Sequence, residues 1–108
     1  MIKKEMAKFG LPTNLHEVFE VEICEYENKD FNCLNCIETL LITPSHDEAW
    51  DYYELQARKR MMELNEARGG LQANGEFYGI RFNQYTLDEN GDYEYENCDD
   101  YWGAYDTW

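Results

Sequence analysis

Basic residues are scarce in this chain, and its last quarter has none. Nine Lys and Arg stand against 23 Asp and Glu, which gives a formal net charge of −14 over 108 residues. No Lys or Arg follows Arg81. Such a surface repels phosphate groups, so the sequence argues against direct binding to nucleic acid or to an anionic membrane surface.

Long apolar runs are also missing. No stretch approaches the roughly 18 apolar residues that a transmembrane helix needs, so no membrane span is expected. Lys3 and Lys4 are not followed by the apolar region of a signal peptide. We therefore expect a cytoplasmic protein, located in the host cytoplasm if a phage encodes it.

Catalytic patterns are absent as well. Ser45 is the only Ser, and neither His16 nor His46 has a nucleophile pattern beside it. Gly69 and Gly70 are not followed by the Lys and Ser or Thr of a phosphate-binding loop. The sequence predicts a protein that is not an enzyme, with no catalytic residues.

What is present predicts one α+β domain over residues 1–108. Apolar residues make up 44% of the chain, enough for a modest core. Alternating apolar and polar residues predict strands at 18–26, 36–43, 76–87 and 92–97. A helix between the second and third strands gives the order β-β-α-β-β, which is a small antiparallel sheet of about four strands with one amphipathic helix on one face.

The helix has clear start and stop signals. Ser45 and Glu48 fit a capping box, and Gly69-Gly70 follows the last helical positions. An apolar stripe at helical spacing is expected to pack on the sheet. Its members are Trp50, Tyr53, Ala57, Met61 and Leu64. Asn90-Gly91 predicts a type I′ hairpin between the last two strands.

Acidic residues recur at the spacing of one strand face. Glu20 and Glu22 are two residues apart, about 7 Å along a strand, and Glu94 and Glu96 repeat this spacing. We expect both pairs to lie on an exposed sheet face, followed by an acidic, aromatic tail at about 99–108. The candidate partner-binding residues are Glu20, Glu22, Asp92, Glu94, Glu96, Asp99 and Asp100, with Tyr101 and Trp102 as aromatic anchors.

In size and charge the chain is similar to the small acidic inhibitors that phages and mobile elements direct against host nucleases. That similarity implies a nucleic-acid mimic of the anti-restriction or anti-CRISPR type, whose partner is a basic, nucleic-acid-binding protein surface. One alternative is an interaction module driven by aromatic residues, with the charge serving solubility or a halophilic host. Exposed edge strands would also permit a homodimer.

Four cysteines leave a metal site open as a further alternative. Cys33 and Cys36 have the C-x-x-C spacing of half a zinc site. Cys24 lies across the predicted hairpin from Cys36, and Cys98 ends the last strand. A zinc-stabilised domain would use these four thiols, whereas the simpler expectation is a protein without a cofactor whose cysteines stay reduced.

Overall fold

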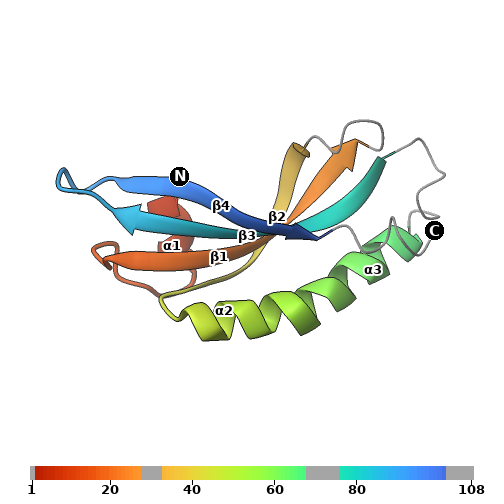
Figure 1. The fold of residues 1–108 in the computed structure, drawn as a ribbon, viewed down its shortest axis with the longest axis horizontal. Coiled ribbons are helices and arrows are strands. Elements are labelled where there is room, and N and C mark those ends of the chain that lie inside the picture. Colours follow the sequence, from red (N-terminus) through yellow and green to blue (C-terminus); the bar gives the residue numbers. More distant parts are fainter. Residues whose placement is uncertain (1, 28–32, 68–75, 102–108) are drawn as a thin grey trace.

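The computed structural model describes residues 2–27, 33–67 and 76–101. The elements are α1 (Ile2–Lys8), β1 (Glu17–Glu27), β2 (Cys33–Thr43), α2 (His46–Tyr52), η1 (Tyr53–Ala57), α3 (Arg58–Ala67), β3 (Glu76–Leu87) and β4 (Tyr93–Tyr101). The strands form one antiparallel sheet in the order β2-β1-β3-β4 (Figure 1). The α+β class and the order β-β-α-β-β predicted from the sequence are confirmed. None of the helices in these ranges is both long enough and apolar enough to cross a membrane.

One face of the sheet packs on the helical segment formed by α2, η1 and α3. Phe19, Val21 and Ile23 alternate along β1 and point toward this segment, where they form the main core with Ile80 and Phe82 of β3. The predicted apolar stripe supplies the helical side of this core, with Trp50 and Leu64 partly buried and Tyr53, Ala57 and Met61 fully buried.

The helical segment contains a π-helical turn, η1, that the sequence pattern did not predict. Its buried residues recur every four positions and are Ala49, Tyr53, Ala57, Met61 and Asn65. In an α-helix a four-residue step overshoots one turn by about 40°, so this series would rotate away from the sheet. The wider π turn corrects the drift and keeps all five residues facing the sheet.

The predicted N-cap is confirmed, although only half of the capping box forms. Ser45 Oγ accepts a hydrogen bond from the Glu48 backbone N–H at 3.2 Å. The Glu48 carboxylate does not return to the cap; it accepts a bond from Thr43 Oγ1 at 3.3 Å. Gly69-Gly70, the predicted stop signal, lies outside the described residues.

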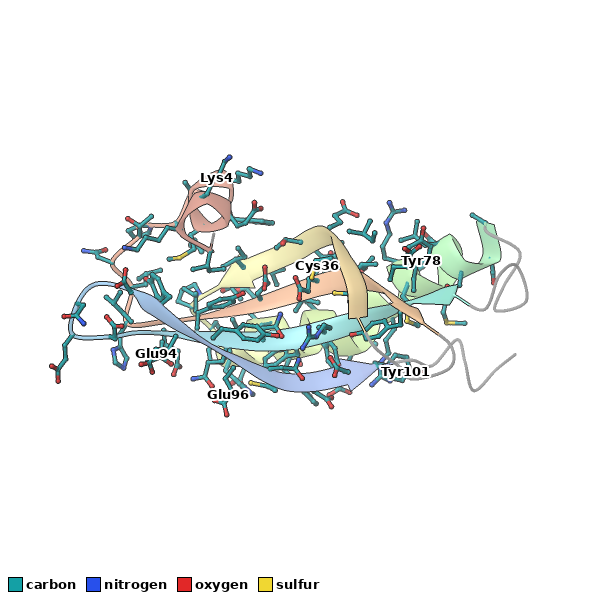
Figure 2. The ribbon with its side chains drawn as sticks, turned by 90° about the horizontal axis from the view of Figure 1, so that it is seen from above. Lys4, Cys36, Tyr78, Glu94, Glu96 and Tyr101 are labelled. Carbon is teal, nitrogen blue, oxygen red and sulfur yellow. The ribbon has the colours of Figure 1, made fainter. Side chains whose placement is uncertain are left out.

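The other face of the sheet is partly covered by α1. Met6 of α1 forms a second buried cluster with Val18 and Ile42, and Figure 2 shows α1 beside the β2 edge. The helix ends in a Schellman motif, in which the Leu11 N–H bonds to the Met6 carbonyl at 3.0 Å and Gly10 takes φ 74°. That reversal leads the chain from α1 into β1.

The β3–β4 hairpin closes differently from the prediction. A two-residue type I′ turn would pair Glu89 with Asp92, whereas the Asp88 N–H bonds to the Asp92 carbonyl at 2.8 Å. The loop therefore has an additional residue, and Gly91 takes φ 83°. The Asp88 carboxylate stabilises it by accepting bonds from the N–H groups of Asn90 and Asp92.

Candidate functional site

Two groups of acidic residues, one buried and one exposed, distinguish this sheet. The expectation that Glu20 and Glu22 lie on an exposed face is wrong, because their side chains are only 4% and 7% exposed. They lie on the face opposite the long helical segment, where α1 and Tyr85 help to cover them. Partner binding through either carboxylate would require access to this partly covered face.

A hydrogen-bond network centred on Asn83 holds these two carboxylates. The fully buried Asn83 amide donates to Glu20 Oε1 at 3.1 Å and to Glu22 Oε1 at 2.9 Å. Its oxygen accepts bonds from the Tyr95 hydroxyl and from Asn97 Nδ2. The side-chain amide of Asn83 on β3 therefore links carboxylates on β1 to side chains on β4, and it fixes the direction of the carboxylate oxygens.

Burial changes the acidity of groups in this network. Desolvation raises the pKa of the Glu20 carboxyl, and the neighbouring Glu22 raises it further. The hydroxyls of Tyr85 and Thr39 donate to the Glu20 carboxylate and oppose that rise. Within the described ranges, Glu20 and Glu22 form no ion pair with a basic side chain.

Cys24 and Cys36 lie beside Glu22. The register of β1 and β2 places the two cysteines directly opposite each other, and their Sγ atoms are 3.4 Å apart, too far for a disulfide. A carboxylate oxygen of Glu22 and both sulfurs lie within 4.8 Å of one another. These three residues are the one set with metal-ligand spacing in the part of the chain that the structure describes.

Irregular pairing in β2 produces this arrangement. The register shifts between Ile23 and Cys24, so that Glu38 pairs with the first and Cys36 with the second. The extra residue between them, Ile37, forms a bulge, which increases the local bend and twist of a strand. Figure 2 shows β2 bending sharply close to Cys36.

The other two cysteines of the predicted zinc set are placed differently. Cys98 does not belong to the group formed by Glu22, Cys24 and Cys36. It occupies a bulge in β4 between Asn97 and Asp99, and burial together with Glu96 raises the pKa of its thiol. Cys33 begins β2, and its side chain lies outside the described residues.

An open pocket of about 530 Å³ leads to the buried carboxylates and to Cys36. Ile2, Glu5 and Lys8 of α1 form one wall, and residues of β2 form another. Lys8, the basic residue among those lining it, is bonded to Glu5 at 3.2 Å. The pocket therefore presents mainly carboxylates and a thiol.

The exposed acidic group lies on the edge strand β4. Glu94 and Glu96 are exposed and alternate with Tyr95 and Asn97, which face the network, so the two glutamates project from the opposite, helix-facing side. Figure 2 shows both of them along the outer margin of β4. Asp92, also exposed, lies at the start of the same hairpin arm.

A bulge extends this set to Asp99. The β3–β4 register shifts between Phe82 and Asn83, which places Asp99 opposite Phe82. Asp99 then faces the helical segment, where its carboxylate accepts a bond from the Tyr53 hydroxyl at 3.2 Å. Glu94, Glu96 and Asp99 form what we call the β4 acidic row, and none of its members is ion-paired within the described ranges.

The remaining predicted partner residues do not join this row. Asp100 points to the network side and pairs with Arg81 at 3.0 Å. Tyr101 lies beneath the Arg58 guanidinium, 4.0 Å from its ring centroid. Both belong to β4 and not to a tail, whereas Trp102 and the rest of the predicted tail lie outside the described residues.

Comparison with protein-family models, curated proteins and solved structures finds no match to this chain.

The sequence analysis did not identify Asn83, and it did not group Glu22 with Cys24 and Cys36. Asn83 stands between Phe82 and Gln84 in a strand and belongs to no motif. Glu22 precedes Cys24 by two residues, a spacing that puts both side chains on one face of a strand and could have indicated a shared site.

Proposed function

We propose that the protein binds a basic, nucleic-acid-binding surface of another protein through the β4 acidic row, and so excludes the nucleic acid from that surface. The observation that supports this most directly is the row itself. Three carboxylates project from one side of an edge strand, and no basic side chain of the described residues is paired to them. A basic partner would supply the missing counter-charge.

The spacing along the row suits this role. Glu94 and Glu96 are separated by about 7 Å, the two-residue repeat of a strand, and the bulge returns Asp99 to the same side. Phosphates along a nucleic-acid strand also recur every several ångströms, so a groove lined with Arg and Lys can accept either series. Binding would release counterions and would weaken as salt rises.

The position of the row on an edge strand adds a second reason. β4 is an edge strand of the sheet, and Glu94, Glu96 and Asp99 on its helix-facing side are exposed. Acidic residues there also disfavour pairing of β4 with a second edge strand, which speaks against a homodimer formed through β4. Restriction enzymes, RNA-guided nucleases and transcription factors are the partner classes with suitable basic grooves.

The test is competition with DNA. The protein is immobilised and incubated with a panel of purified nucleases and repressors, and bound proteins are challenged with duplex DNA at low and high salt. A partner displaced by DNA and by salt supports the proposal. Binding that survives both treatments would contradict it and favour a contact made by aromatic residues.

A matched pair of variants locates the surface. Neutralising the row by Glu94→Gln, Glu96→Gln and Asp99→Asn should weaken binding at least about tenfold, because charge pairs across an interface contribute about 1.5 kcal/mol or more each. The control changes Asp51→Asn, Glu63→Gln and Glu66→Gln, three exposed acids of the helical segment, and alters the net charge equally. Equal losses in both variants would exclude a specific role for the row.

A further inference from the structure

We propose that Cys24, Cys36 and Glu22 form a binding site for a zinc-class divalent cation, with one coordination position open to the pocket between α1 and β2. The site is separate from the β4 acidic row and does not depend on the proposed binding function. It keeps two of the four thiols suggested by the sequence and adds a carboxylate.

The ligand geometry is close to what zinc requires. Two Zn–S bonds of about 2.3 Å in a tetrahedral site place the sulfurs about 3.8 Å apart. The Cys24 and Cys36 sulfurs are 3.4 Å apart across a fixed strand pair, so a small side-chain rotation reaches this spacing. The Glu22 oxygen is already within 4.8 Å of both sulfurs.

The surroundings orient the carboxylate as metal sites commonly do. Asn83 Nδ2 holds Glu22 Oε1 at 2.9 Å, which leaves Oε2 for a cation. Such bonds from a second residue fix the direction of a ligand and raise metal affinity. Asn83 is itself held by Tyr95 and Asn97, so the geometry is supported from two strands.

The charge of the region also favours a cation. Glu20 and Glu22 are buried side by side, and within the described ranges no Lys, Arg or His pairs with either. Two buried carboxylates without a counter-ion are costly. A divalent cation beside Glu22 would offset that cost, and the presence of two sulfurs favours zinc over magnesium or calcium, which prefer oxygen ligands.

The number of ligands indicates the type of site. Structural zinc sites are closed by four protein ligands, whereas three protein ligands leave a position for water or another small ligand. Here the exposed Cys36 and the buried Glu22 both line the open pocket, so that position would face solvent. The small ligand it would accept is a neutral donor such as water, because the carboxylates that line the pocket of about 530 Å³ would repel an anion.

The experiment is a zinc titration of the full chain, kept reduced with a phosphine, in competition with a chromophoric chelator. Native mass spectrometry gives the stoichiometry, and cobalt(II) replaces zinc to report thiolate ligation by its absorption. We expect one ion per chain and a tetrahedral, sulfur-ligated cobalt spectrum. Absence of stoichiometric binding, or a cobalt spectrum without thiolate bands, would overturn the proposal.

The variants make the site assignment falsifiable. Cys36→Ser removes an exposed thiol and should weaken zinc binding by at least about 100-fold, since loss of an outer-shell partner alone costs about 10- to 100-fold. Cys98→Ser, a change at an exposed thiol outside the cluster, should leave affinity unchanged. The reverse pattern would place the ion elsewhere.

Folding of each variant is checked without metal. Circular dichroism should show the same metal-free fold for the wild type, Cys36→Ser and Cys98→Ser, because neither serine replaces a fully buried side chain. Added zinc should then raise the thermal midpoint of the wild type and of Cys98→Ser but not that of Cys36→Ser. An equal zinc-dependent rise in all three proteins would refute the assignment.

Discussion

One polar side chain, Asn65, bonds the backbone of β3 on the side away from β1, near the residue where β3 begins. Asn65 is fully buried in α3, and its amide bonds both backbone groups of Tyr78, accepting from the N–H at 2.7 Å and donating to the carbonyl at 2.9 Å. Pairing of β3 with the described part of β4 starts only at Ile80. Asn65 therefore connects α3 to β3 at Tyr78, two residues before the described pairing of β3 with β4 begins at Ile80.

Replacing Asn65 with Ala should lower the free energy of unfolding by about 1 to 3 kcal/mol, because it removes two hydrogen bonds from a buried position. Urea unfolding followed by circular dichroism measures the change. The control is Gln56→Ala, which truncates an exposed amide on the same helical segment and should stay within about 0.5 kcal/mol of the wild type. Similar losses from both variants would show that Asn65 has no special role.

Cys98 reports the electrostatic field of the β4 acidic row. Burial raises the pKa of its thiol, and Glu96 and Asp99 raise it further. A higher pKa means less thiolate at a given pH, so alkylation of Cys98 should become fast only at a pH above that of a model thiol. Alkylation rates across pH, measured by peptide mass spectrometry, give the apparent pKa.

The variant Glu96→Gln with Asp99→Asn should shift this alkylation profile to lower pH, because it removes two carboxylates that disfavour the thiolate. Added salt should shift the wild-type profile in the same direction by screening those charges. An unchanged profile in the variant would mean that burial alone controls the Cys98 thiol.

At the scale of elements, the N-terminus of α2 depends on one side chain. Ser45 Oγ accepts the Glu48 N–H, one of the otherwise unpaired donors of the first turn. Ser45→Ala should therefore destabilise the protein by about 1 kcal/mol. Ser45→Asp keeps an acceptor at the cap and adds a negative charge at the positive end of the helix, so it should retain wild-type stability in the same unfolding measurement.

The elements that the sequence predicted well are those with strong periodicity. Alternation in β1 and the apolar stripe at helical spacing from Trp50 to Leu64 identified the faces that form the main core. The π turn was not predictable from apolar spacing, because the predicted stripe from Trp50 to Leu64 has the spacing of an ordinary α-helix, and the four-residue series of buried positions includes the polar Asn65. Contacts with the sheet favour the wider turn, because it keeps Tyr53, Ala57 and Met61 buried against the strands.

The candidate sites were also predicted only in part, because tertiary contacts that the sequence pattern does not show decide which strand face is covered. Alternation correctly put Glu94 and Glu96 on one side of a strand, and it also put Glu20 and Glu22 together. Alternation could not predict which face of the sheet is covered, because that depends on α1, whose Met6 packs on Val18 of β1 and Ile42 of β2. A bulge in β4, which carries no reliable sequence signal, then moved Asp99 to the acidic row, whereas Cys36 lies opposite Cys24 as the sequence predicted.

For the whole molecule, the dominant property is self-repulsion. The chain carries a net charge of −14 within extents of 45 × 24 × 20 Å. At 0.01 M salt the screening length is about 30 Å, so acids across the width of the molecule repel one another, whereas at 0.15 M it falls to about 8 Å. Repulsion of this kind destabilises the compact state.

Stability should therefore rise as sodium chloride increases from about 0.01 to 0.15 M, measured as the midpoint of urea unfolding, which adds no ions of its own. The variant Glu94→Gln with Glu96→Gln, which leaves the Asp99–Tyr53 hydrogen bond in place, should be more stable than the wild type at low salt, with the difference shrinking as salt is added. Such a result would mean that the acidic row costs stability, as expected of residues kept for binding. A row that stabilises the isolated protein at low salt would contradict this reasoning and would assign those carboxylates to the fold.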